Sequence, residues 1–183
     1  MNIDKKSHLV TVHTHLKLGE LRKKLNHSNY DIGFFAGKSA EDCTLKNILE
    51  ENIPNLWHLR HGEIYDMCTS LVVSTSIGHI RTKKVPRAAT GPDLKKIFMG
   101  SRHHYGDIQE VTLQIIPKPE LRKLVKINSD KKILQKIWAS GIRPLTIRYQ
   151  KKMIWVELEG IEDIVLAEED ILKLLVIQQK GIL

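Results

Sequence analysis

Cysteines, aromatic residues and long apolar runs are all scarce in this 183-residue sequence. Its two cysteines, Cys43 and Cys68, match neither a metal-binding spacing nor a disulfide framework. No segment approaches the ~18 apolar residues that a membrane-spanning helix needs. The charged amino terminus also lacks the apolar core of a signal peptide. These absences predict a cytoplasmic chain with reduced thiols and no membrane span.

The composition excludes collagen-like, low-complexity and wholly disordered chains, because 42% of the residues are hydrophobic and 27% are charged. With 29 Lys and Arg against 21 Asp and Glu, the net charge is +8. The basic residues occur mostly as scattered pairs, apart from one run at 81–87, and aromatic residues make up 5%, too few for a base-stacking platform. We therefore expect a solvated basic surface rather than a nucleic-acid site, although a basic nucleic-acid or phosphate binder is one alternative class.

The first part of the chain mixes strands and short helices. Apolar alternation predicts strands at 9–14, 70–75, 79–82 and 108–116, of which the second and third form a hairpin. Helical spacing predicts three helices, with inward-facing residues Leu18, Leu21 and Leu25; Leu45, Ile48 and Leu49; and Leu94, Ile97 and Phe98. Capping residues predict that the second helix begins at Ser39 or Asp42 and the third at Asp93.

A second unit begins near residue 120, after the turn-forming segment Pro117-Lys118-Pro119. Its pattern predicts, in order, a strand, a helix, two strands, a helix and a last strand, at 121–127, 130–138, 144–149, 153–159, 162–174 and 175–178. This βαββα(β) order is typical of a ferredoxin-like unit.

Common catalytic motifs are absent: there is no Walker loop, no nucleophile elbow and no His-Glu-x-x-His. The most suggestive segment is the loop 100–106, whose glycines and donors are suited to an anion. His103 and His104 are adjacent in this loop, so they are expected to point apart, and no third ligand is near in the sequence. We therefore expect no metal site. Gly62 and Asp66 are consistent either with loop chemistry or with an ordinary turn.

A series of short motifs, in a fixed order, resembles one known family. The motifs are Gly62-Glu-Ile-Tyr-Asp66, Leu71-Val-Val73, Gly78, the stretch 85–94, Gly100-Ser101, and 106–113 followed by Pro117. They resemble the FAD-binding domain of FAD-linked oxidases of the PCMH type (the vanillyl-alcohol oxidase superfamily), and most of all the FAD-binding E subunit of glycolate oxidase. Weaker similarity upstream and downstream extends the resemblance over about residues 9–175.

The resemblance implies an α+β fold. The second lobe of a PCMH-type FAD-binding domain, a mixed or antiparallel sheet with flanking helices, would be followed by a small βαββα ferredoxin-like unit. Residues 1–119 would form a partial FAD-binding domain, and 120–183 the start of the substrate-side, or cap, domain. The implied cofactor is FAD, and the implied reaction is the oxidation of an α-hydroxy acid. By the same resemblance, the cofactor-binding residues would be Thr44, Lys46, Gly62, Asp66, Gly91, Gly100, Ser101, Gly106 and Ile108.

The family places a further, glycine-rich lobe before this region, so the chain resembles a truncated member. The family's Thr-(Ile/Val)-Gly-Gly is here Thr44-Leu45-Lys46-Asn47. Because side chains replace bare backbone where a phosphate should approach, we expect the isolated chain to bind FAD weakly at best and to show no activity alone.

Three hypotheses follow. The first is an FAD-binding subunit or fragment of an oxidoreductase that works with other subunits, with a missing amino-terminal lobe or as a homo-oligomer. The second is a degenerate, non-catalytic family member that acts as an interaction protein. The third is the basic nucleic-acid or phosphate binder.

Overall fold

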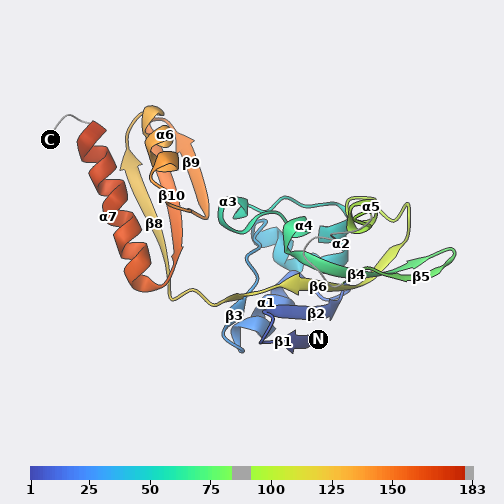
Figure 1. The fold of residues 1–183 in the computed structure, drawn as a ribbon. Helices are drawn as coiled ribbons and strands as arrows, with labels where there is room; N and C mark the ends of the chain where they lie inside the picture. Colours follow the sequence, from blue (N-terminus) through green and yellow to red (C-terminus); the bar gives the residue numbers. More distant parts are fainter. Residues whose placement is uncertain (84–91, 180–183) are drawn as a thin grey trace. The chain divides into compact units, whose positions relative to one another are not determined.

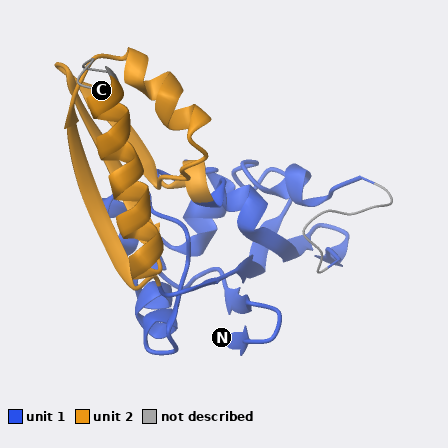
Figure 2. Ribbon diagram, turned by 60° about the vertical axis from the view of Figure 1, so that its left-hand side comes forward, with its two compact units in different colours: residues 1–56, 61–118 blue, residues 57–60, 119–183 orange. Residues whose placement is uncertain are grey.

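The computed structural model describes residues 1–83 and 92–179 and divides into two compact units (Figure 1, Figure 2). Unit 1 comprises Met1–Leu56 and His61–Lys118, and unit 2 comprises Trp57–Arg60 and Pro119–Leu183. Both units combine antiparallel sheets with helices, which confirms the α+β class. Gly91 and most of the basic run at 81–87 lie outside the described residues.

Unit 1 contains a five-stranded antiparallel sheet in the order β1-β2-β6-β4-β5 (Figure 1). The strands are β1 Asn2–Asp4, β2 Leu9–His13, β4 Cys68–Thr75, β5 Gly78–Arg81 and β6 Asp107–Gln114. The predicted hairpin is the β4–β5 pair, and the predicted strand after residue 107 is the central strand β6. All four apolar residues predicted to be buried there are buried: Ile108, Val111, Leu113 and Ile115.

Short helices cover the apolar face of this sheet. They are α1 Leu18–Asn26, the 3-10 helix η1 Lys38–Asp42, α2 Leu45–Glu50, α4 Ile64–Met67 and α5 Lys95–Phe98. The four-residue helix α3, His58–His61, falls mostly within the Trp57–Arg60 segment of unit 2 and contributes no buried residue. The predicted inward residues of α1 and α2 are all fully buried in one apolar core with β2, β4 and β6. A two-residue strand, β3 Tyr30–Asp31, pairs with β7 Ile116–Pro117.

Two local predictions for unit 1 are wrong. The residue that caps α2 is Thr44 rather than Ser39 or Asp42, because residues 38–42 form a 3-10 turn of their own before the chain extends at Cys43. Ile97 was expected to face inward, but it is 42% exposed. The helix α5 has only four residues, so only Phe98 of its apolar side chains reaches the core.

Unit 2 is a three-stranded antiparallel sheet, in the order β8-β10-β9, with two helices. Its elements are β8 Leu121–Asn128, α6 Lys132–Ala139, β9 Thr146–Gln150, β10 Met153–Gly160 and α7 Glu162–Gln179. Alternate residues of β8 and β10 pack with buried residues of both helices in a second core. This confirms the predicted βαββα unit, but the last predicted strand, 175–178, is wrong, because α7 continues through it.

None of the described helices is both long enough and apolar enough to cross a membrane.

Candidate functional site

The helix α2 begins with a well-defined cap. The Thr44 hydroxyl accepts a hydrogen bond from the Asn47 backbone N–H (3.2 Å) and donates one to the Asn47 side-chain oxygen (2.7 Å). This is the normal behaviour of a threonine at a helix start. Lys46 follows in the first turn, and Glu50 is the last residue of the helix.

The loop 100–107 lies against the carboxyl end of α2. The backbone N–H of Gly100 donates to the Leu49 carbonyl (2.9 Å), and that of Arg102 donates to the Glu50 carbonyl (3.2 Å). The loop bends sharply, with positive φ at Gly100, Arg102, His103 and Gly106. These hydrogen bonds satisfy backbone carbonyls in the last turn of α2, which have no N–H partner within the helix.

Gly106 is required by packing. Its φ is +152°, and a Cβ there would lie 2.7 Å from Cγ1 of Val73 and 2.8 Å from the Ser74 carbonyl oxygen. The residue therefore brings the start of β6 against β4, and its lack of a side chain is explained by the protein itself.

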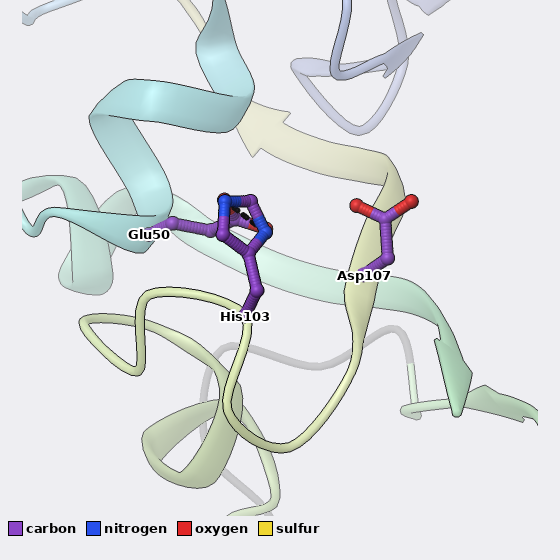
Figure 3. Close-up of side chains that lie close together, drawn as sticks. All are labelled: Glu50, His103 and Asp107. Carbon is purple, nitrogen blue, oxygen red and sulfur yellow. Dashed lines mark ion pairs between the residues drawn. The ribbon is translucent and has the colours of Figure 1, made fainter. Parts of the chain in front are cut away.

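Four charged or titratable side chains meet between α2 and this loop (Figure 3 shows three of them). His103 Nδ1 lies 2.8 Å from Oε2 of Glu50. Asp107, at the start of β6, forms an ion pair with Lys46. The Glu50 side chain is 3% exposed, whereas the His103 side chain is 58% exposed, so a buried carboxylate lies beneath an accessible imidazole.

Burial controls the electrostatics of this cluster. Desolvation raises the pKa of Glu50 above its ordinary value, and the nearby His103 and Lys46 charges, together with the Ile108 backbone N–H, lower it. The net direction is upward, because removal from water disfavours the ionised carboxylate.

Gly62 and Asp66 belong to a different group at the start of α4. The Asp66 carboxylate accepts a hydrogen bond from the Glu63 backbone N–H (2.9 Å), as one half of a capping box. Gly62 has φ +76°, and a Cβ there would lie 2.8 Å from the Asp66 carboxylate. Its carbonyl accepts a hydrogen bond from the buried Asn55 amide (2.7 Å). The ordinary-turn interpretation therefore accounts for both residues.

The structure thus brings together six of the predicted cofactor residues, namely Thr44, Lys46, Gly100, Ser101, Gly106 and Ile108, along α2, the loop and the start of β6. Ile108 is buried in the core. Gly62 and Asp66 form their own group, and Gly91 lies outside the described residues.

The polar side chains of this cluster do not fit the pyrophosphate of FAD. The Thr44 hydroxyl caps α2, the Ser101 hydroxyl donates to a backbone carbonyl of α5 (2.8 Å), and the Lys46 ammonium is paired with Asp107. The Glu50 and Asp107 carboxylates would repel a phosphate brought to the same place.

The resemblance implies the second lobe of a PCMH-type domain, a sheet with flanking helices, followed by a βαββα unit, and solved structures share this fold. Two structures of alkyldihydroxyacetonephosphate synthase superpose on 96% of this chain, with TM-scores of 0.80 and 0.79 at 19% identity. The chain corresponds to 40% of each of those chains.

Two curated proteins are similar in sequence. Alkyldihydroxyacetonephosphate synthase of Caenorhabditis elegans is 30% identical over 104 residues, which are 56% of this chain and 17% of that protein. Glycolate oxidase subunit GlcD of Bacillus subtilis (strain 168) is 29% identical over 118 residues, 61% of this chain and 25% of that protein. No family model matches the sequence. The predicted resemblance to FAD-linked oxidases of the PCMH type is confirmed, over a part of each relative's length.

Sequence reasoning missed the most compact group of the site. Glu50 lies in an ordinary amphipathic helix, and only the fold brings it to His103. A glutamate among the apolar stripe residues Ile48 and Leu49 was the one available signal, because a charge at the buried end of a helix needs a partner.

Proposed function

We propose that this chain is an FAD-binding subunit or fragment of an FAD-linked oxidoreductase and that it does not hold FAD on its own. The observation that carries the proposal is the superposition of 96% of the chain on part of a larger synthase, together with the sequence similarity to two enzymes or enzyme subunits. Within this proposal, residues 1–119 are part of an FAD-binding domain, and 120–183 begin the substrate-side domain.

The proposed partner is a polypeptide that supplies the remaining flavin contacts. The side chains of Thr44, Lys46 and Ser101 already interact with other groups of this chain, so they are not available to bind a pyrophosphate. This supports a second polypeptide as the source of the remaining flavin contacts. The similarity to a glycolate oxidase subunit supports an α-hydroxy acid as the substrate class. The name of that relative also supports assembly with other subunits.

A second candidate function is a non-catalytic interaction protein with the same fold. The observation that favours it is the charge of the cluster where the FAD phosphates were expected to bind. Two carboxylates, one of them buried, pair there with one lysine and one histidine. In this case the lobe would be retained for its surface rather than for flavin.

The experiment that separates the two is purification of the tagged chain from its own cells, with its bound partners. The first proposal predicts that the complex carries flavin absorbance and reduces a dye acceptor when glycolate is added, and that the stripped chain does neither. A stable complex without flavin, and without glycolate-dependent reduction, would favour the interaction protein.

A further inference from the structure

Glu50, His103 and Asp107 are far apart in the sequence, but each offers one ligand atom, and these atoms all lie within 4.8 Å of one another (Figure 3). They come from three places: the end of α2, the loop, and the first residue of β6. The closest pair is His103 Nδ1 and Glu50 Oε2, at 2.8 Å. A spacing of this size lets a single ion contact all three groups after small side-chain rotations.

The second observation is an unsatisfied buried oxygen. The Glu50 side chain is 3% exposed, and its other oxygen, Oε1, is buried without a hydrogen-bond partner among the described residues. Buried carboxylate oxygens are normally paired, since leaving one without a partner costs free energy. A cation bound beside Glu50 would supply the missing partner.

We propose that Glu50, His103 and Asp107 form a binding site for one divalent first-row transition-metal ion. One imidazole nitrogen with two carboxylate oxygens suits Zn²⁺ or Mn²⁺ better than Ca²⁺ or Mg²⁺, which prefer all-oxygen sites. Three protein ligands leave a coordination position open for water or another ligand. A cavity of about 230 Å³, lined by Asn47, Glu50, Glu51, Arg102 and His103, gives access from solvent.

Lys46 competes with the metal ion for the Asp107 carboxylate. Its ammonium is paired with Asp107, so the metal must share this carboxylate or displace the lysine. The two carboxylates carry two negative charges when ionised, and Lys46 offsets one of them. Removal of the Lys46 charge should therefore leave Asp107 free and strengthen metal binding. An increase in metal affinity on loss of this lysine is specific to the proposed site, because the charge of a lysine elsewhere on the surface is screened by salt and has only a weak effect on binding.

The test uses the full chain, stripped with chelator and titrated with Zn²⁺ by calorimetry, with Co²⁺ as a visible-absorption probe of the ligands. We expect one ion per chain. His103→Asn and Glu50→Gln should each weaken binding by more than about 100-fold, because even outer-sphere changes cost 10–100-fold. Lys46→Gln should bind more tightly than the natural sequence. None of these measurements depends on flavin.

His104→Asn is the matched control, because His104 is exposed and its Nδ1 contacts the Ser101 carbonyl of its own loop (2.7 Å) rather than the cluster. It should bind Zn²⁺ as the natural sequence does. A melting curve without metal identifies any variant that fails to fold, and His103→Asn, at an exposed position, keeps the test valid if Glu50→Gln does not fold. Absence of saturable Zn²⁺ and Co²⁺ binding by the folded chain, or equal binding by His103→Asn, would overturn the proposal.

Discussion

Single residues hold the fold together through their burial and their contacts. Val111 illustrates the simplest case: it lies at the centre of β6, is fully buried, and pairs in register with Val12 and Leu71 on the two neighbouring strands. The alternation of apolar residues was sufficient to predict this burial, because a central strand with one covered face has a period of two.

Val111→Asp should destabilise unit 1 by several kcal/mol, about 3 or more, because an unpaired charge would enter the core. The matched control is Gln114→Asp on the same strand, where the side chain is exposed and the cost should be within about 0.5 kcal/mol. Urea unfolding measures both. Equal midpoints for the two variants would contradict the assignment of β6 as the central strand.

Cys68 carries the clearest pH signal. Burial raises the pKa of its thiol to about 12 from an ordinary 9.0, while the nearby Lys95 charge acts in the opposite direction. Above pH 9 the unfolded chain releases the thiol proton and the folded chain keeps it, so the free energy of unfolding falls as the pH rises, by up to about 1.4 kcal/mol per pH unit.

The measurement is urea unfolding at several pH values between 8.5 and about 10.5. The natural sequence should lose stability faster than Cys68→Ala over this interval. Iodoacetamide should modify only Cys43 in the folded protein, since Cys68 is fully buried, and both thiols after unfolding. Rapid labelling of two thiols in the folded chain would contradict the burial of Cys68.

At the scale of elements, an arginine joins three segments of unit 1. Arg22 of α1 forms ion pairs with Asp31 of β3 (2.8 Å) and Glu41 of η1 (3.2 Å), and it donates to the Phe34 carbonyl (2.6 Å). The Asp31 side chain is only 5% exposed. These three contacts of Arg22 therefore fix the positions of segments that have little regular structure of their own.

Arg22→Met should cost about 3–5 kcal/mol, because it removes the guanidinium that pairs with the buried Asp31 carboxylate. Lys23→Met, next to it on the exposed side of α1, should be nearly neutral. Adding Asp31→Asn to Arg22→Met should recover part of the loss. If the double variant is no more stable than Arg22→Met, the buried charge of Asp31 is not the cause.

The same elements show how far sequence reasoning reaches. Strands β2, β6, β8 and β10, and the helices α1 and α6, were predictable from apolar residues that recur on one face. Strand β4 was predictable from the turn at Ile77-Gly78, which marks a hairpin. The carboxyl-terminal end of α7 was not, because Leu175-Val176-Ile177 is a short apolar run with two β-branched residues, which suits a strand as well as a helix. Thr44 was missed as a cap because Ser39 and Asp42 offered the same chemistry a few residues earlier.

The site was predictable only in part. A glycine-bounded loop at 100–106 could be inferred from the sequence, but its contacts with α2 through Gly100 and Arg102 could not. The charge cluster could not be inferred, because Glu50, His103 and Asp107 meet only through the packing of α2 against the loop and β6. The internal pairing of Lys46 with Asp107 was equally invisible, since spacing in a sequence does not reveal contacts between distant elements.

For the whole molecule, the fold is shared with part of a larger synthase, and the proposal is that the chain alone does not complete a flavin site. The fold rests on the superposition with a larger chain, of which this one spans 40%. The proposal of an incomplete flavin site is supported by the polar side chains around α2 and the loop, which already pair with other groups of the chain.

The most direct measurement is a titration of the purified, isolated chain with FAD, followed by the quenching of flavin fluorescence. Several lost hydrogen bonds to a charged group, at roughly 1.5–3 kcal/mol each, weaken binding by several powers of ten. We expect no saturation at micromolar FAD and no oxidation of glycolate by the chain alone. Stoichiometric FAD that remains with the chain through purification, together with glycolate oxidation, would contradict it.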